Sequence, residues 1–561
     1  MRVRLFPLLI LIGILFVALR LPGLDLPYHQ DEWKNVAAAA DPASGAYWAH
    51  PPLFQVLFRA GSAITGPDAF RLLPLLFSLG CFALLYLVVK ARAGTRAALF
   101  SLLFFALCFY NVLGSLMPDV DGAIIPFFFL LSVYYYDRYM HAPDPRKNRF
   151  LALLLLSLML GFLVKLNFVL VIGTLLLDYL WNQRHSLTRK RLTMFVGGGI
   201  AFGGAYVALL YVIQAIYPSF TIAAMIGHAD QFAPGQERQY LQIAVQSIKA
   251  VYYLSPLLIL PLLLVSKRVA AQVTPFLIYL VSGLFFYLVL FDFSRGALDK
   301  YLMFLIVPLC VVVGTLFADV FAQREVQEGG VWKGIRGAVG LGGALSMALI
   351  ALNFIPHEVA ALYPKTEWFA RIVHGQWNVL TPLTGGSGPL GFYVSFLFIA
   401  VSYGGAALIL IAANIRPEWQ RSALSMLFVI AIAYNGIFLE ELMWGRINGN
   451  ARAVVRDTVA YVAQDASIKK VLTYNDSGAG LLEGAGKYGG RFYATPSFEE
   501  GHKEKFAAFE GAYMVVDIPH LYENGFYAQF FANCTVLHET VSGRITGRVY
   551  DCRNAKALLT Q

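Results

Sequence analysis

The sequence contains little charge. Only 14% of its 561 residues are Asp, Glu, Lys or Arg, whereas a soluble globular protein carries roughly 25%. The chain is instead 58% hydrophobic, with 43 Phe and 30 Tyr. So many apolar side chains exclude both a soluble enzyme and a disordered chain. This composition is typical of a polytopic α-helical membrane protein.

Cysteines and nucleic-acid-binding signals are also scarce. The five cysteines are too few for a disulfide scaffold and lack the paired spacing of a zinc site. Cys534 and Cys552 lie in the polar C-terminal part, where they are candidates for a disulfide if that part faces an oxidising compartment. The net charge of +10 comes without a basic run interleaved with aromatics. It therefore argues against nucleic acid as a partner and indicates cytoplasmic loop anchors.

Thirteen segments are apolar enough to be candidate spanning helices. They centre on residues 5–20, 71–90, 97–114, 122–140, 149–163, 165–181, 193–215, 250–266, 273–291, 301–321, 335–354, 391–413 and 422–440. If the N-terminus is cytoplasmic, Lys and Arg gather in the inside connections, as the positive-inside rule requires. This orientation leaves three long outside loops, at 21–70, 218–249 and 355–390.

The composition changes after residue 440. Residues 1–440 hold the spanning segments, whereas residues 441–561 are polar and contain glycines and short β-type runs. The runs 470–474, 491–493, 512–517 and 549–552, together with a helical stretch at about 450–464, predict a small α/β domain. The glycine-rich segment 476–480 is interpreted as a loop. An odd number of spans places this domain outside, and the whole chain fits a bacterial inner membrane.

Acidic side chains concentrate in the first two outside loops. Asp31 and Glu32 follow the first span, and adjacent carboxylates are costly to hold beside lipid. Asp119 and Asp121 lie in a very short loop between two apolar helices. These acids are either catalytic groups, one of them a general base, or ordinary solvated residues of a loop. The alternation of the second pair predicts that only one of its two acids faces a site.

Basic side chains are predicted to meet these acids at the same membrane face. His50 precedes two prolines that fix its backbone and is partly charged near neutral pH. Lys165 interrupts an apolar run, where it either snorkels or faces a polar cavity. Arg295 and Lys300 flank the tenth span and suit either an anionic headgroup or simple anchoring. Such a cluster suits attack by a hydroxyl on a carbon that bears a phosphate leaving group.

These motifs together resemble those of the GT-C superfamily of membrane glycosyltransferases. The resemblance is to its bacterial branch, which is similar to protein O-mannosyltransferases and the lipid A aminoarabinose transferase. The matching motifs are Asp31-Glu32, His50-Pro51-Pro52-Leu53, Arg71-Leu72-Leu73-Pro74, Asp121, Leu163-Val164-Lys165, and Lys300-Tyr301 followed by Pro308. Many members have Lys where this chain has His50, and Asp119 rivals Asp121 as the acid of the second loop. The resemblance covers about residues 1–320.

The resemblance implies the GT-C fold, a sugar donor linked to polyprenyl phosphate, and inverting transfer outside the membrane. It makes Asp31 the base and lets Glu32 and Asp121 shape the site, or hold the acceptor or a metal. It assigns His50, Lys165 and Lys300 to the donor phosphate, to which the charge pattern adds Arg295.

The acceptor and a metal requirement remain open at this point. Trp368 and Trp377, in the outside loop 355–390, are candidates for stacking on an acceptor sugar, although interfacial aromatics also serve as membrane anchors. The acceptor is a glycan, a lipid or a protein. The acids of the first two loops can bind a divalent metal such as Mg or Mn, or the neighbouring cations can replace it.

The main alternative function is that of a transporter or flippase for lipid-linked glycans. A transporter predicts charged residues deep in several spans and an internal repeat. The sequence offers only Lys165 within an apolar run and no repeat. A glycosyltransferase is therefore the favoured prediction.

Overall fold

The computed structural model describes residues 5–41, 50–185, 188–233, 238–293, 299–322, 331–383 and 390–559. The chain divides into two compact units. The first comprises Met1–Leu24, Asn35–Leu254 and Leu258–Glu328, and the second comprises Asp25–Lys34, Ser255–Leu257 and Gly329–Gln561. The second unit therefore combines the C-terminal part with a short piece of the first predicted outside loop and with three residues of α11.

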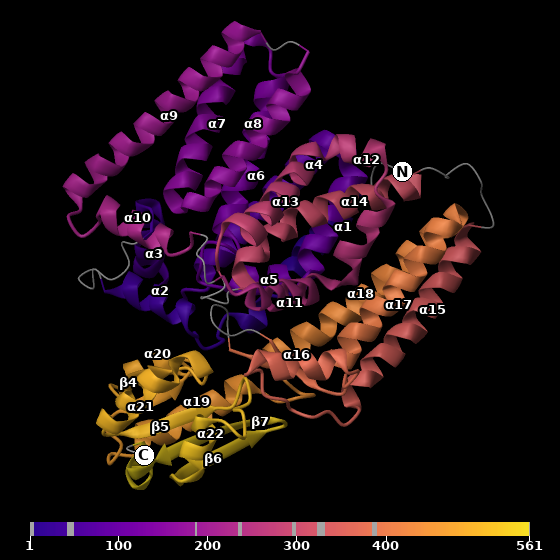
Figure 1. The fold of residues 1–561 in the computed structure, drawn as a ribbon. Helices are drawn as coiled ribbons and strands as arrows, with labels where there is room; N and C mark the ends of the chain where they lie inside the picture. Colours follow the sequence, from indigo (N-terminus) through magenta and orange to yellow (C-terminus); the bar gives the residue numbers. More distant parts are fainter. Residues whose placement is uncertain are drawn as a thin grey trace. The chain divides into compact units, whose positions relative to one another are not determined.

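In the described residues of the first unit, all regular secondary structure is helical (Figure 1). Its helices are α1 (Leu5–Ala18), α3 (Pro52–Thr65), α4 (Leu72–Leu107), α5 (Phe109–Leu116), α6 (Ile124–His141), α7 (Asp144–Val164), α8 (Val169–Gln183), α9 (Arg189–Ile216), α10 (Ile222–Asp230), α11 (Tyr240–Ile259), α12 (Lys267–Gln272), α13 (Thr274–Phe285) and α14 (Ile306–Ala322). Helix α2 (Asp31–Ala40) begins in the second unit and continues into the first. A break at Gly94, where φ is 88°, divides α4 into two helices.

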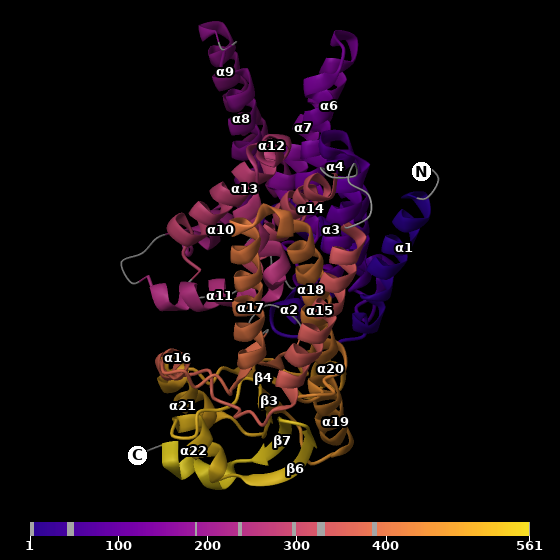
Figure 2. The same ribbon diagram turned by 90° about the vertical axis from the view of Figure 1, so that its right-hand side faces the viewer.

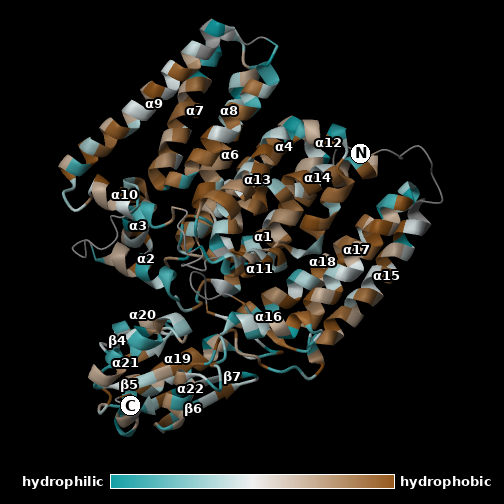
Figure 3. Ribbon diagram, in the orientation of Figure 1, coloured by the Kyte–Doolittle hydropathy of each residue, from teal (hydrophilic) through white to brown (hydrophobic). Residues whose placement is uncertain are grey.

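Nine helices among the described residues are long and apolar enough to cross a membrane. Helices α6, α8 and α13 and the second half of the broken α4 account for the remaining predicted segments, so all thirteen coincide with helical structure. Figure 3 shows apolar residues along α4, α7, α9 and α17. The prediction of a polytopic helical membrane protein is confirmed. The segment expected from residue 391 begins as a helix only at Phe396, because the residues before it form a strand.

The second unit contains three long helices, α15 (Val331–Ala351), α17 (Phe396–Ile415) and α18 (Gln420–Met443), which lie side by side in both views (Figures 1 and 2). Between α15 and α17 the chain forms α16 (Lys365–Val373) and an antiparallel pair of short strands, β1 (Leu380–Leu383) and β2 (Phe392–Ser395). This connection corresponds to the predicted outside loop 355–390.

A five-stranded sheet follows α18, in the order β4-β3-β5-β7-β6; Figure 2 labels its strands β3, β4, β6 and β7. Its strands are β3 (Val471–Tyr474), β4 (Tyr488–Phe492), β5 (Ala512–Val516), β6 (Thr535–Ser542) and β7 (Ile545–Asp551). Strand β3 runs parallel to both β4 and β5, and β7 runs antiparallel to β5 and β6. The prediction of a C-terminal α/β domain is confirmed. Its boundary at residue 440 remains a prediction.

Helices cover both faces of this sheet. Met514 and Val516 of β5 share a core with Val454 of α19 (Ala451–Gln464). Tyr513 and Val515, on the opposite face, pack with aromatic side chains of α21 (Glu499–Ala508) and α22 (Phe526–Ala532). Helix α20 (Ala479–Gly484) connects β3 to β4. Alternate residues of a strand thus supply two separate apolar cores.

Strand β6 is absent from the sequence prediction. Its residues are mostly exposed at the edge of the sheet, so the strand does not show the apolar run of a buried strand. Cys534 and Cys552 form a disulfide that joins the residue before β6 to the residue after β7.

Candidate functional site

The second predicted outside loop is a short buried connection between α5 and α6, over residues 117–123. Arg71, which is fully buried, donates a hydrogen bond from Nη1 to the carbonyl oxygen of Leu116, at 2.6 Å. The side-chain amide of Asn35 donates to the carbonyl oxygen of Pro118, at 2.8 Å. Two polar side chains from elsewhere in the chain therefore fix the backbone that carries Asp119 and Asp121.

Close backbone packing also fixes this loop. A Cβ atom on Gly122 would lie 2.4 Å from the carbonyl oxygen of Gly114 in α5. We expect Gly122→Ala to lower the free energy of unfolding by about 1–3 kcal/mol, because backbone must move to admit the methyl group. Gly173→Ala is the matched control, because a Cβ there has no neighbour within 4 Å. Thermal unfolding in detergent compares the two variants, and equal stability would mean that the loop is not tightly packed.

Two buried ion pairs form around the loop. The Lys300 Nζ donates to an Asp119 oxygen, and the Lys165 Nζ donates to an Asp121 oxygen, both at 2.6 Å. Asp119 and Asp121 are 5% and 6% exposed, so both carboxylates depend on their lysines for compensation. The alternation in the sequence predicts that only one acid faces a site. Because the loop bends and turns instead of running extended, both acids meet lysines.

A break in the helical structure positions Lys165. It lies between the end of α7 and the short 3-10 helix Leu166–Phe168, with an extended backbone. Its ammonium lies 4.8 Å from the ring centroid of Tyr301, and the ammonium of Lys300 lies 5.8 Å from the same centroid. The Lys165 ammonium pairs with Asp121, and its side chain is 15% exposed. The two lysines therefore gather beside one aromatic ring.

His50 belongs to the same group of side chains. Its ring meets that of His228 edge-on, with 4.8 Å between the centroids. Burial, followed by the positive charges of Lys165 and His228, lowers the pKa of His50 to about 3. The sequence predicts a partly charged His50, because a histidine in a solvated loop keeps its ordinary pKa. Here the side chain is buried, so the pKa falls. Near neutral pH the imidazole of His50 is therefore uncharged and offers a hydrogen bond instead of a positive charge.

The low pKa of His50 predicts a pH dependence of stability. Below the ordinary pKa of 6.5 the unfolded chain takes up a proton at His50, whereas the folded chain stays neutral there down to about pH 3. This contribution to the free energy of unfolding is therefore complete above pH 6.5, and it is lost as the pH falls below that ordinary pKa. Between about pH 7 and about pH 5, wild type should lose more thermal stability than His50→Gln. Equal losses in the two proteins would show that folded His50 carries a proton.

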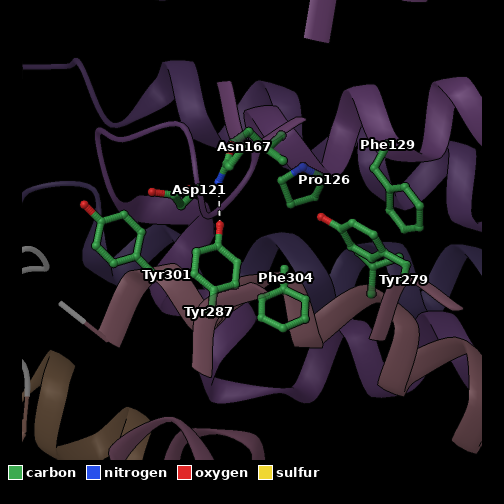
Figure 4. A pocket seen from close by; sticks show the side chains of 10 residues that line it. Asp121, Pro126, Phe129, Asn167, Tyr279, Tyr287, Tyr301 and Phe304 are labelled. Atoms are coloured by element: carbon green, nitrogen blue, oxygen red, sulfur yellow. Dashed lines mark hydrogen bonds between the residues drawn. The ribbon is translucent and has the colours of Figure 1, made fainter. Parts of the chain in front are cut away.

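A pocket opens beside Asp121 (Figure 4). Its other lining residues are Ile125, Pro126, Phe129, Asn167, Tyr279, Tyr287, Tyr301, Phe304 and Val307. The side-chain amide of Asn167 donates to the Tyr287 hydroxyl. The lining is mostly apolar and aromatic, with the polar groups of Asp121 and Asn167 and the tyrosine hydroxyls among it. Tyr279 and Tyr287 were not predicted, because they lie within an apolar run that reads only as a spanning helix.

Asp31 and Glu32 open helix α2 and belong to the second unit. An Asp31 oxygen accepts a hydrogen bond from the Lys34 Nζ at 2.8 Å, and the Asp31 side chain is 21% exposed. Glu32 is fully buried and accepts from the backbone N–H of His29, at 3.2 Å. Acidic residues in a first helical turn are stabilised by the helix dipole. Glu32 thus shapes the local backbone, while Asp31 keeps an exposed carboxylate.

The remaining predicted residues differ in their placement. Arg295 lies outside the described residues. Trp368 is 7% exposed and packs edge-on against Phe396 of α17, so its faces are not open for stacking on a sugar. Trp377 also contacts Phe396 edge-on but is 42% exposed. Trp377 therefore remains the accessible aromatic of the pair.

The donor groups in the described part of the chain do not fit a metal site. It contains no group of three or more His, Cys, Asp and Glu residues that could hold a metal ion. Asp119 and Asp121 each bind an ammonium group, so a divalent ion at either carboxylate would compete with a lysine already there. We derive no catalytic step through a metal.

Comparisons with known proteins support this description. Residues 49–222 match the family model of dolichyl-phosphate-mannose-protein mannosyltransferases. No curated protein matches the chain. The fold is similar to that of ArnT from Cupriavidus metallidurans in the apo state, with a TM-score of 0.53 and 15% identity over 98% of each chain. ArnT from the same organism bound to undecaprenyl phosphate aligns with a TM-score of 0.54 and 12% identity, over 96% of this chain and 97% of that one.

The long apolar helices and the extent of the structural match define a multi-pass membrane protein with the GT-C fold. The family match covers both the Asp119–Asp121 loop and Lys165. Over residues 49–222 the chain is thus similar to dolichyl-phosphate-mannose-protein mannosyltransferases, and over nearly its whole length it shares the fold of ArnT.

Proposed function

We propose that this protein transfers a sugar from a polyprenyl-phosphate donor to an acceptor hydroxyl, with inversion, at the outer face of a bacterial inner membrane. The observation that carries the proposal is the buried group of two carboxylates and two lysines beside an aromatic-lined pocket. Undecaprenyl phosphate is bound in one of the two ArnT structures that share this fold. The N-terminus is then cytoplasmic and the C-terminal sheet lies in the periplasm or outside the cell.

The lysines supply what the leaving group needs. A sugar linked to polyprenyl phosphate carries one negative charge, and the polyprenyl phosphate that leaves carries a second. Lys165 and Lys300 lie beside the same Tyr301 ring, and we infer that one phosphate contacts both. Fixed cations that meet charge as it develops lower the barrier, because they need no rearrangement during the reaction. Neutral His50 adds a hydrogen bond to the same phosphate.

Asp31 removes the proton from the acceptor. The acceptor oxygen attacks the anomeric carbon as the bond from that carbon to the phosphate oxygen breaks, and the proton passes to Asp31. The hydrogen bond from Lys34 favours the ionised carboxylate that this role requires. Asp31 is the first residue of α2. The acceptor is a glycan, a lipid or a protein hydroxyl.

Mass spectrometry of lipid-linked sugars and surface glycans tests this function in cells with and without the chain. Without the chain, one polyprenyl-phosphate sugar should accumulate, and one glycan, lipid or protein should lack a single sugar. The missing mass then identifies both the sugar and the acceptor. If instead an intact glycan lipid moves from one leaflet to the other only when the chain is present, the protein is a transporter.

A further inference from the structure

The C-terminal sheet has an edge at which open α/β sheets bind ligands. Strand β3 lies between β4 and β5, to both of which it runs parallel. The chain passes from β3 to β4 on one side, then crosses to β5 on the other. The loops that follow such strands form a crevice at the carboxyl ends, where the strand order reverses. Any occupant of this edge would contact residues just after β3 and β4.

A piece of the chain's own first outside loop contacts those residues. Trp33 packs against Gly480, at the start of α20 after β3: a Cβ on Gly480 would lie 2.7 Å from Cε3 of the Trp33 ring. Only glycine admits the ring at this distance. Burial is the main cause that raises the pKa of Tyr493, just after β4, and the charges of Asp476 and Asp31 add to it. Asp31 is thus close enough to Tyr493 for their charges to interact.

The same piece is also anchored at its start. The Asp25 carboxylate pairs with Arg452 in α19, and a second arginine of that helix, Arg456, donates to the Asp25 carbonyl oxygen at 2.9 Å. The side chain of Arg456 lies 3.6 Å from the Asp25 carboxylate. Residues Asp25–Lys34 form one compact unit with the C-terminal part. This decapeptide, which carries Asp31 and Glu32, therefore contacts the C-terminal sheet domain at both of its ends.

Hydrogen bonds within the domain hold the turn that directly precedes α20. Asp476, whose side chain is 1% exposed, accepts hydrogen bonds from Arg491 at 2.6 Å and from the Tyr488 hydroxyl at 2.8 Å. Its backbone has a φ of 60°, which non-glycine residues rarely adopt. The charge pair and the hydroxyl thus hold a strained turn directly before α20. A braced turn offers Trp33 a rigid surface, since bonded neighbours fix its backbone.

We propose that the C-terminal sheet domain positions the catalytic acid: its Gly480 in α20 and its α19 arginines hold residues 25–34, and so fix the direction of Asp31. Gly480, Arg452 and Arg456 are then positioning residues, which act through Trp33 and Asp25. This inference rests on the proposed role of Asp31 as base. It gives the C-terminal domain a part in catalysis that requires no contact of its own with the substrate.

Gly480→Ala in the full-length chain tests the proposal, with Gly484→Ala as the matched control. Both glycines lie in α20, but a Cβ on Gly484 has no neighbour within 4 Å. The substrate is the pool of polyprenyl-phosphate sugars extracted from cells that lack the chain, together with their acceptor fraction. Gly480→Ala should lower kcat about tenfold or more, because a misplaced base loses much of its rate advantage. KM for the donor should not change, since the donor phosphate contacts lie elsewhere.

A rescue and a physical readout separate positioning from general damage to the fold. Trp33→Leu should restore most of the kcat of Gly480→Ala, because a smaller side chain leaves room for the methyl group. Amide hydrogen exchange in residues 25–34 should be faster in Gly480→Ala than in Gly484→Ala. The proposal is overturned if the two alanine variants agree in both kcat and exchange, or if Trp33→Leu restores neither.

The same assay distinguishes this proposal from the proposed function. If Asp31→Asn remains active, Asp31 is not the base and the proposed function fails. If Asp31→Asn is inactive while Gly480→Ala matches Gly484→Ala, the function stands and only the positioning role fails.

Discussion

Asp31→Asn is expected to reduce sugar transfer by about 10²–10⁴-fold, the usual contribution of a positioned general base. The amide has nearly the same shape as the carboxylate but cannot take up the proton of the acceptor hydroxyl. Asp31 is partly exposed at the first turn of α2, where it pairs with Lys34, three residues later, and asparagine keeps the shape and hydrogen-bond acceptor of that side chain. The variant should therefore fold and insert as the wild type does.

A matched control makes this result specific. Asp68→Asn makes the same chemical change at an exposed residue of the same predicted outside loop, and it should leave transfer unchanged. Quantitative mass spectrometry of the product in cells that produce equal amounts of each variant measures both effects. Near wild-type transfer by Asp31→Asn would remove this residue from the role of base.

Lys165→Met is expected to have the second large effect, on both stability and transfer. The Lys165 ammonium is the partner of a carboxylate whose side chain is 5% exposed. Removing one member of a buried ion pair leaves an uncompensated charge and costs about 3–5 kcal/mol. Thermal unfolding in detergent should show this loss directly, and transfer should fall together with it.

A second substitution separates the two effects. In Lys165→Met/Asp121→Leu both charges are gone, so most of the lost stability should return, as when hydrophobic residues replace a buried pair. Transfer should stay low, because Lys165 is proposed to contact the donor phosphate. If the double variant recovers both stability and transfer, the pair is structural and Lys165 does not serve the phosphate.

The helices were predictable because a membrane imposes a simple rule on them. An apolar run of sufficient length must be helical to satisfy its backbone in lipid, so all thirteen segments were located from hydropathy. Structural details that do not depend on hydropathy could not be predicted. The kink at Gly94 depends on one backbone conformation, and β6 is an exposed edge strand without an apolar run.

The charged residues around the pocket were predictable for a related reason. A carboxylate or ammonium beside lipid is costly, so Asp119, Asp121, Lys165 and Lys300 stood out against their apolar neighbours. Their pairing was not predictable, because it depends on how residues more than forty positions apart meet. The low pKa of His50 depends in the same way on burial and on distant lysines.

The link between Trp33 and Gly480 also left no signal in the sequence. A glycine after a strand predicts a turn, and a tryptophan near a span predicts an interfacial anchor. Neither pattern indicates that a ring from one end of the chain fills the space above a glycine near the other. That contact requires the folded second unit.

The most direct measurement of the central claim uses the purified protein in lipid vesicles. It follows the release of polyprenyl phosphate from extracted polyprenyl-phosphate sugars in the presence of the acceptor fraction, for wild type and Asp31→Asn. Wild type should release polyprenyl phosphate and transfer one sugar with inverted configuration, and Asp31→Asn should do neither. Equal release by both proteins, or movement of the intact lipid-linked sugar across the vesicle without release, would contradict a glycosyltransferase that uses Asp31 as its base.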